Sequence, residues 1–291
     1  MPEMPEVEIL ARHLRPLLRG KKIRSASVRR ERATRPTPPR EFEKAVVGAK
    51  LKELTRRGKY LLFEFESRQA GLARTGNAKS GAGTLTVLGH LGMSGRMFVA
   101  LKNETLPKHA AVIFDLGNRN FVYEDRRYLG RMTLDLSPLR ELGPEASDFS
   151  PEAFAAALKG SRQAIKIKLL DQSLIAGVGN IYASEALFRA RLSPRLAADE
   201  LTPAQSKTLL RAIGDVLNDA IKFGSTVGLK TMSGKSGGLF YFDDGGEGYY
   251  EERLRVYDRE GKPCLRCGTR IERITQGARS TYFCPHCQRV R

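Results

Sequence analysis

The chain has 291 residues, 41% of them hydrophobic and 28% charged, so it is long enough for two domains and too apolar for wholesale disorder. With 50 Lys and Arg against 32 Asp and Glu, its net charge is +18. Such a charge favours a polyanionic partner, nucleic acid first; the alternative is a basic ribosomal or membrane-surface protein. Because the chain lacks a long apolar stretch and its N-terminus is acidic, we expect a cytoplasmic protein with no membrane partner.

The chain is expected to open with a short amphipathic helix over residues 5 to about 15. Pro5 suits the first turn, and Pro16 is expected to end or kink the helix. Its apolar face consists of Val7, Leu10 and Leu14.

Residues 22 to about 134 predict an antiparallel β-sandwich or barrel. They contain short alternating or apolar runs separated by Gly, Asn and Pro. These runs are KIRSASVRR, KYLLFEF, TLTVLGH, RMFVAL, AAVIFDL and NFVYED. Residues 67–83, rich in Gly, Ala and Ser, are expected to form a long surface loop with no chemical role.

The second half is expected to be mostly helical after a linker at about 135–150, where Pro, Gly and Ser are frequent. PEAFAAAL begins with Pro at a first-turn position, ASEALFRA follows a Gly-rich turn, and Thr202 is placed to cap TPAQSKTLLRAIGDVLNDAIKF. A Gly-rich, strand-poor stretch at 233–248 then precedes the tail.

All four cysteines lie in the last 28 residues, as Cys264-Leu-Arg-Cys267 and Cys284-Pro-His-Cys287. Two CxxC pairs on a β-hairpin bring four thiolates around one tetrahedral ion, so the spacing predicts a zinc site. Four thiolates leave no open coordination position, which makes the zinc structural. Six arginines surround the cysteines, so the zinc ribbon is also expected to contact nucleic acid.

Removal of Met1 would expose Pro2 as a free secondary amine. An α-amino group has a pKa of roughly 7.7–8.0, against ~10.4 for lysine, so it is far more often unprotonated at neutral pH. Such an amine can attack an aldehydic carbon and form an iminium, while Glu3 and Glu6 lie close enough in sequence for proton transfer. The alternative is an ordinary second residue followed by acids that favour a helix N-terminus.

A Gly-rich turn, GVGN at 177–180, leads into IYASEALF. Free backbone N–H groups at such a turn can bind a phosphate, and Asn180 can add its side-chain amide. The alternative is that Asn180 is an N-cap.

Together these segments resemble the formamidopyrimidine-DNA glycosylase (Fpg/Nei) family over nearly the whole chain. The family opens with Pro-Glu-Leu-Pro-Glu-Val-Glu, and this chain opens with PEMPEVE after Met1. LLDQSLIAGVGNIYASEALF resembles its helix–two-turn–helix element, and GARSTYFCPHC resembles the end of its zinc finger.

The resemblance implies a catalytic set of Pro2, Glu3, Glu6, Lys59 and Arg279. Pro2 would attack C1′ of the damaged nucleotide, and Glu3 would assist ring opening. Glu6 would organise the pocket and Lys59 would reach phosphates near the lesion. Arg279 would grip a phosphate and assist δ-elimination.

The resemblance also implies DNA contacts by His90, Met93, His109, Arg126 and Asn180. His90 and Asn180 would bind phosphates, and Met93 would fill the gap left by the everted base. Arg126 would pair with the orphaned base, with Arg127 as the alternative, and Tyr128 would take the place of the aromatic wedge. The family usually has Phe-Gly after its paired arginines, whereas this chain has Tyr128-Leu129-Gly130.

We therefore expect an α+β multidomain protein: a catalytic β-sandwich with an opening helix at 1–137, a helix–two-turn–helix domain at 150–250 and a four-cysteine zinc finger at 255–291. The implied function is a bifunctional glycosylase and AP lyase that removes oxidised purines by β,δ-elimination from damaged or abasic double-stranded DNA. It would act as a nucleoid-associated monomer with one Zn²⁺. The alternatives are a glycosylase for oxidised pyrimidines and a non-catalytic damaged-DNA-binding homologue.

Overall fold

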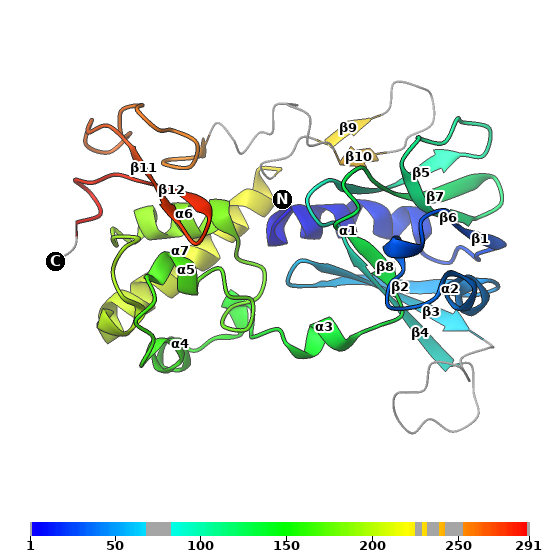
Figure 1. Cartoon of the computed structure of the whole chain (residues 1–291), viewed down its shortest axis with the longest axis horizontal. Helices are drawn as coiled ribbons and strands as arrows, with labels where there is room; N and C mark the ends of the chain where they lie inside the picture. The colour runs from blue at the N-terminus through cyan, green and yellow to red at the C-terminus, as the bar shows by residue number, and fades with distance from the viewer. Residues whose placement is uncertain (1, 68–82, 225–228, 232–238, 242–252, 290–291) are drawn as a thin grey trace. The chain divides into compact units, whose positions relative to one another are not determined.

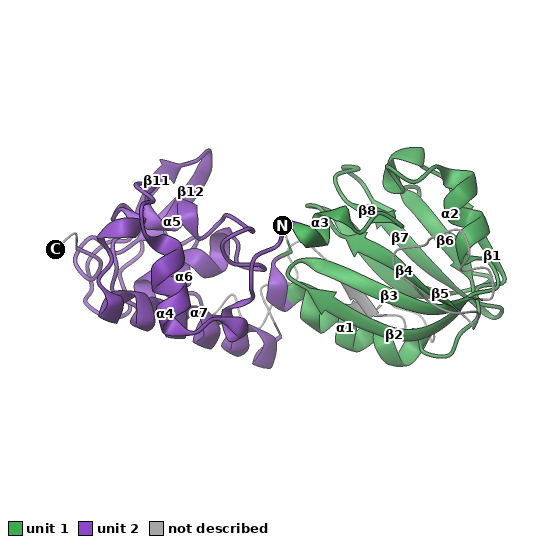
Figure 2. Cartoon of the chain, turned by 90° about the horizontal axis from the view of Figure 1, so that it is seen from below, with its two compact units in different colours: residues 1–2, 6–140, 227–248 green, residues 3–5, 141–226, 249–291 purple. Residues whose placement is uncertain are grey.

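The computed structural model describes residues 2–67, 83–224, 229–231, 239–241 and 253–289 (Figure 1). Almost all of the expected loop at 67–83 and most of the Gly-rich stretch at 233–248 lie outside the described residues. The chain divides into two compact units (Figure 2). Unit 1 comprises residues 1–2, 6–140 and 227–248, and unit 2 comprises residues 3–5, 141–226 and 249–291.

Unit 1 contains two four-stranded antiparallel sheets. The first, in spatial order, consists of β2 (Lys50–Arg57), β3 (Tyr60–Ser67), β4 (Gly83–His90) and β8 (Arg131–Thr133). The second consists of β1 (Ser25–Val28), β6 (Ala110–Asp115), β7 (Arg119–Asp125) and β5 (Gly95–Leu101). A separate antiparallel pair is formed by β9 (Leu229–Thr231) and β10 (Leu239–Tyr241).

One hydrophobic core joins the two sheets and the opening helix. The rings of Phe63 on β3 and Phe121 on β7 meet edge to face at 5.6 Å. Helix α1 (Met4–Leu18) adds its predicted apolar face to the same core. The predicted β-sandwich with an opening helix is confirmed.

The prediction that the first helix would end near residue 15 was wrong, because α1 contains Pro16 and runs to Leu18. Proline displaces the carbonyl four residues earlier, here that of Arg12. Both Pro16 and Arg12 lie on the exposed face, where water can bind the freed carbonyl. Leu18 is buried in the core and holds the last turn in place.

Sequence periodicity did not predict two elements of unit 1. A bulge between Leu51 and Glu53 breaks the apolar alternation of β2. Helix α2 (Pro39–Val46) has only eight residues, too few for the apolar face that includes Phe42 and Val46, both fully buried, to repeat along the sequence. Short helical turns complete the unit at η1 (Glu31–Ala33) and α3 (Ser137–Arg140).

Unit 2 is mainly helical and has its own core, formed around Phe154, Leu187 and Ile213. The Thr202 cap is confirmed, since its hydroxyl accepts from the Gln205 N–H at 3.2 Å. The elements are η2 (Ala146–Asp148), α4 (Pro151–Leu158), α5 (Ile165–Lys168), α6 (Asn180–Arg189), η3 (Ala198–Glu200) and α7 (Pro203–Lys222).

The unit ends with an antiparallel hairpin of β11 (Glu272–Gln276) and β12 (Arg279–Phe283). The first unit's main segment ends at Arg140, within the stretch expected to be a linker. Among the described residues, no helix has both the length and the apolar character needed to cross a bilayer.

Candidate functional site

The first turn of helix α6 in unit 2 donates hydrogen bonds to a carboxylate from the start of the sequence, that of Glu3. Glu3 is 2% exposed, and its side chain accepts hydrogen bonds from the backbone N–H groups of Ile181 (2.9 Å) and Tyr182 (3.4 Å). The N-cap residue, Gly179, makes no side-chain cap. The Glu3 carboxylate therefore occupies the helix end, where the helix dipole favours negative charge.

Any side chain at position 179 would displace that carboxylate. A Cβ on Gly179 would lie 2.5 Å from Glu3 Oε1 and 2.6 Å from Oε2. The Gly179 backbone is extended, so the requirement comes from the close approach and not from an unusual φ. The GVGN turn thus fixes where Glu3 points.

Asn180 links three segments of unit 2 that are far apart in sequence. Its Oδ1 accepts from Lys166 Nζ at 2.7 Å, and its Nδ2 donates to the Ser280 carbonyl at 2.9 Å. Asn180 is the first residue of α6 and not its N-cap, so the alternative interpretation as a cap was wrong. These bonds bring the start of α6 beside the start of β12, where Arg279 lies exposed.

Lys166 on α5 has no solvent-exposed surface. Burial lowers the pKa of Lys166 to about 8; Glu3 opposes that shift, and the charge of Arg279 adds to it. The charges of Glu3, Lys166 and Arg279 are thus close enough to interact. The sequence did not single out Lys166, because its segment, AIKIKLL, shows no sign that one of its two lysines is buried.

In unit 1, Lys59 and His90 lie at one end of the first sheet. Tyr60 opens β3 and pairs with His90, which closes β4, and their rings lie 4.8 Å apart. His90 pairs in turn with Arg131 of β8. Lys59 is only 8% exposed, so it is not a solvated surface lysine.

Burial, together with the surrounding cations, keeps the His90 imidazole neutral. Burial lowers the pKa of His90 to about 4, with further lowering by the charges of Arg131 and Lys59 and an opposing effect of Asp125. Its Nδ1 accepts from the Gly92 N–H at 3.2 Å, which leaves the proton on Nε2. His90 can therefore offer a phosphate an N–H donor without a positive charge.

The predicted intercalating residues lie on two loops of unit 1. Met93, after β4, is 37% exposed, and Arg126, after β7, is also exposed. His109 and Tyr128 are brought together, with His109 Nδ1 3.2 Å from the Tyr128 hydroxyl. The guanidinium carbon of Arg30 lies over the Tyr128 ring, 5.5 Å from the ring centroid.

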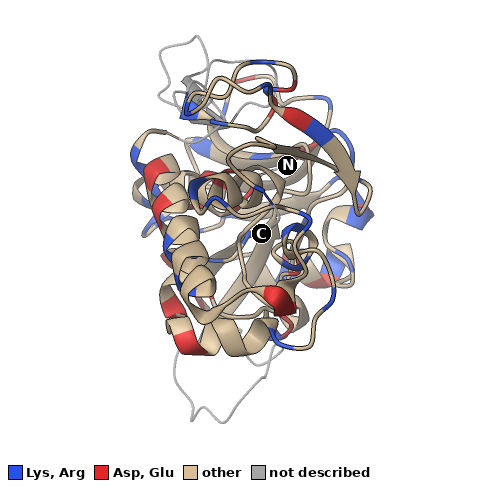
Figure 3. Ribbon diagram, turned by 90° about the vertical axis from the view of Figure 1, so that its left-hand side faces the viewer, with Lys and Arg blue, Asp and Glu red and all other residues tan. Residues whose placement is uncertain are grey.

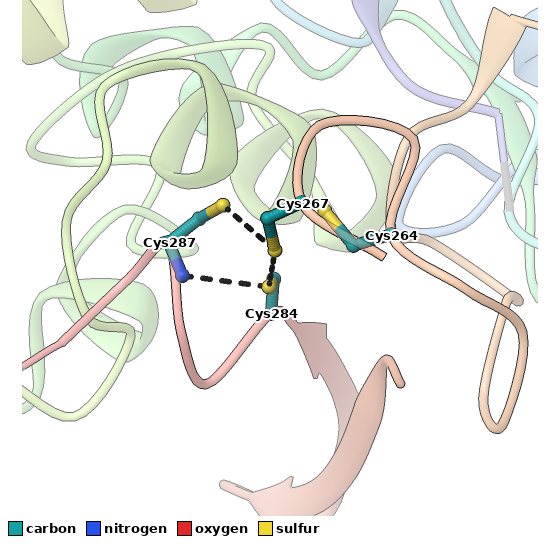
Figure 4. Close-up of side chains that lie close together, drawn as sticks. All are labelled: Cys264, Cys267, Cys284 and Cys287. Atoms are coloured by element: carbon teal, nitrogen blue, oxygen red, sulfur yellow. Dashed lines mark hydrogen bonds between the residues drawn. The ribbon is translucent and has the colours of Figure 1, made fainter. Parts of the chain in front are cut away.

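The four cysteine side chains of unit 2 converge on one point (Figure 4). Their sulfurs all lie within 4.8 Å of one another, with Cys267 3.5 Å from Cys284 and 3.4 Å from Cys287. A tetrahedral zinc with Zn–S bonds of about 2.3 Å places its sulfurs roughly 3.8 Å apart. The cluster therefore fits one structural zinc ion.

Backbone donors support the same assignment. The Arg266 N–H donates to Cys264 Sγ and the Cys287 N–H to Cys284 Sγ, both at 3.4 Å. Such bonds stabilise thiolates and orient them toward a metal.

The two other N-terminal residues of the predicted catalytic set differ in burial. Pro2 is half-buried, and Glu6 on α1 is 1% exposed. A cavity of about 410 Å³ lies at the other end of α6, around Phe188 and Leu265. It contains none of the predicted site residues.

Basic residues recur along the helices, strands and loops of the chain (Figure 3). A two-layer β-unit opened by a Pro-Glu segment, followed by a helical unit with a four-cysteine ribbon, defines the class of helix–two-turn–helix DNA glycosylases. Family comparison agrees: residues 1–132 match the formamidopyrimidine-DNA glycosylase N-terminal domain, 142–231 its H2TH domain, and 261–290 the zinc finger found in FPG and IleRS. The chain belongs to the formamidopyrimidine-DNA glycosylase family.

Relatives match over the full length. The formamidopyrimidine-DNA glycosylase of Chloroflexus aurantiacus is 40% identical, covering 99% of this chain and 98% of its own, and that of Listeria innocua is 35% identical, covering 99% and 100%. Among solved structures, a mutant of the Lactococcus lactis FPG bound to Fapy-dG DNA superposes with a TM-score of 0.83 at 29% identity, covering 99% of this chain and 100% of that one. A structure of MutM with carbocyclic 8-oxo-G DNA has a TM-score of 0.82 at 30% identity, with the same coverage.

Proposed function

We propose that this chain is a base-excision repair enzyme that removes oxidised purines from duplex DNA and then cleaves the strand as an AP lyase. Family membership over the whole chain and the Fapy-dG and 8-oxo-G DNA bound by its structural relatives support the substrate class. The observation that carries the chemistry is the buried Glu3 carboxylate, held by α6 amides next to Pro2 in the chain.

Pro2 is the proposed nucleophile once Met1 has been removed. Its nitrogen attacks C1′, the bond from C1′ to the damaged base breaks, and the base leaves with the electron pair and takes up a proton. The nitrogen then loses its proton and the C1′–O4′ bond breaks, with O4′ taking up a proton, so the sugar ring opens and an iminium remains at C1′. This iminium withdraws electrons from C2′. Loss of a C2′ proton then expels the 3′ phosphate by β-elimination, and δ-elimination expels the 5′ phosphate.

Glu3 is the proposed proton-transfer group for ring opening. A general acid or base must be held within hydrogen-bond reach of its proton, and the two α6 N–H groups restrict the Glu3 carboxylate to one position. Glu6, almost fully buried, is proposed to organise the pocket.

Each unit supplies proposed phosphate contacts. Lys59 and His90 act from the end of the first sheet in unit 1. Asn180 and Arg279 act from the adjoining starts of α6 and β12 in unit 2. Loss of either cation, Lys59 or Arg279, is expected to weaken DNA binding and lower the slope of log K against log salt concentration by about 0.9, whereas loss of the neutral His90 or Asn180 should weaken binding without changing that slope.

The proposed intercalating residues are Met93 and, on the second loop, Leu129 in preference to Tyr128. Leu129 is 43% exposed, whereas Tyr128 is held by His109 and Arg30. The wedge lies two residues after the arginine that pairs with the orphaned base. With Leu129 as the wedge, that arginine is Arg127, the alternative given above, and not Arg126. His109 then acts through Tyr128 more than through DNA.

Borohydride trapping tests the proposed chemistry. The processed protein should form a covalent complex with an 8-oxoguanine duplex, and Pro2→Gly should form none. A chain in which Met1 is retained, verified by mass spectrometry, is the matched control, because its Pro2 nitrogen is an amide and should not trap. Trapping by the Pro2→Gly variant would refute Pro2 as the nucleophile.

A lesion panel tests the substrate class. Excision of 8-oxoguanine and formamidopyrimidine should be faster than excision of thymine glycol and dihydrouracil. The Lactococcus lactis relative also has a structure with oxidised-pyrimidine DNA, so pyrimidine lesions are the relevant competitors. Binding to abasic DNA without cleavage would favour a non-catalytic protein. We further propose that the enzyme acts as a monomer on the nucleoid, where its substrate lies.

A further inference from the structure

One buried carboxylate joins the two loops that carry the proposed intercalating residues. Asp125, at the end of β7, is 1% exposed. Its Oδ1 accepts from the Ser94 hydroxyl (2.7 Å) and the Arg127 N–H (3.1 Å). Its Oδ2 accepts from the Gly130 N–H (2.8 Å) and the Tyr123 hydroxyl (3.4 Å). One side chain thus ties the loop at 91–94 to the loop at 126–130.

The backbones of the two loops are also packed against each other. A Cβ on Gly92 would lie 2.5 Å from the Gly130 nitrogen and 2.6 Å from the Leu129 carbonyl carbon. A Cβ on Gly130 would collide with the His90 carbonyl oxygen. The Ser94 hydroxyl accepts a further bond from the Arg127 N–H at 3.1 Å. The loops therefore form one body whose polar centre is Asp125.

This body presents two apolar side chains to solvent. Met93 and Leu129, on the tips of the two loops, are among the few exposed large hydrophobic residues of the described chain. Tyr128, between the loop's arginines and Leu129, has a left-handed backbone with φ of 54°. A bulky residue keeps that conformation only where its surroundings enforce it, and such strain is frequent at functional sites.

The chemistry of Asp125 suits this role better than that of an amide. Four donors converge on its two oxygens, and a backbone N–H bonded to each requires an acceptor on both sides. Asparagine has the same shape but only one acceptor oxygen, so one loop would face an N–H₂ group where it needs an oxygen. Leaving such a donor unsatisfied in a buried place is strongly unfavourable.

We propose that Asp125 is a positioning residue that holds Met93 and Leu129 as one rigid wedge, and that it thereby sets how efficiently a stacked damaged base is everted. This inference rests on the proposed glycosylase function and deepens it. Asp125 does not touch the reacting atoms, so it acts only on the step that opens the base stack. An abasic site has no base to evert, and its cleavage does not need that step.

The test is to compare two activities of Asp125→Asn under single-turnover conditions. Excision of 8-oxoguanine from duplex DNA should fall about 10- to 100-fold, as expected for loss of a hydrogen bond to a charged group. Cleavage of a preformed abasic site should stay within about threefold of wild type, because it bypasses base eversion. The fluorescence change of a 2-aminopurine beside the lesion should slow with excision. Asp115→Asn is the matched control and should change neither activity, because Asp115 closes β6 in the same sheet, paired with Lys102 and bonded to the Gly117 N–H.

A double-mutant cycle tests whether Asp125 acts through Leu129. If it does, Asp125→Asn should slow excision far less in a Leu129→Ala background than in wild type. Ser94→Ala provides a milder variant, because it removes one donor to Asp125 while the Arg127 N–H keeps its bond to the carboxylate. It should slow excision severalfold and leave abasic-site cleavage intact.

Three results would overturn the inference: no change in either activity, an equal fall in both, or additive effects of Asp125→Asn and Leu129→Ala. An equal fall with a lower Tm would mean that Asp125 only stabilises the unit. Inactivity of the wild-type chain on both substrates would refute the proposed function itself, and the inference with it.

Discussion

Replacing Gly179 by alanine should separate activity from folding, because the new methyl group meets one functional side chain. The Cβ would lie 2.3 Å from Glu3 Cδ and 2.5 Å from Oε1, whereas ordinary contact begins near 3.4 Å, so the carboxylate must retreat by about 1.1 Å. The 2.9 Å bond from the Ile181 N–H would then be lost. The Gly179 backbone is extended and accepts alanine without strain, so only Glu3 has to move.

The loss of stability should be moderate. A hydrogen bond to a charged group contributes about 1.5–3 kcal/mol. At roughly 2–4 °C per kcal/mol for a chain of this size, Tm should fall by roughly 3–12 °C. Activity should fall much further, because a misplaced general acid or base forfeits about 10²- to 10⁴-fold in rate.

The assay is single-turnover excision of 8-oxoguanine, together with thermal melting. Gly214→Ala is the matched control: Gly214 lies within α7 with no atom within 4 Å of its would-be Cβ, so alanine there should leave excision unchanged. A Glu3→Gln/Gly179→Ala double variant should be no slower than Glu3→Gln alone. A Gly179→Ala variant that excises within about threefold of wild type would refute the assignment of Glu3, since loss of a general acid or base costs far more.

Three further outcomes follow from the site. Chelation of zinc or Cys264→Ser should unfold the ribbon and weaken DNA binding more than tenfold, with one zinc per chain measured in the wild type; unchanged affinity would contradict this. In an NMR titration, His90 should stay neutral down to about pH 5, with its proton on Nε2. Its pKa is lowered to about 4 in the folded protein, so its contribution to the free energy of unfolding is complete above about pH 6.5 and is lost as the pH falls toward 4. Lys166→Met, which frees Asn180, should lower DNA affinity about tenfold, whereas Lys168→Met, a partly exposed lysine on the same helix, should have little effect; equal effects would argue against a specific role.

Features encoded by neighbouring residues were predicted well. The zinc cluster follows from two CxxC spacings, since the short chain between the two cysteines of each pair holds their thiols together. The cap at Thr202 was likewise predicted correctly, because it depends on residues three apart in the chain. Prediction failed where a local irregularity hid the pattern, as with the bulge in β2, or where the tertiary core overrode a local signal, as with Pro16 inside α1.

The sequence by itself determined the family, the candidate catalytic residues at the N-terminus and the zinc ligands, because these are short motifs whose residue types carry the chemistry. Only the tertiary structure decided which polar residues hold them in place. Lys166 and Asp125 resemble ordinary surface charges in the sequence, yet burial among specific donors and acceptors makes one a partner of Asn180 and the other the link between two loops. The physical reason is that a buried charge is stabilised by partners that are distant in the chain. Glu3 and the start of α6 are such partners, and no pattern of neighbouring residues shows that they will meet.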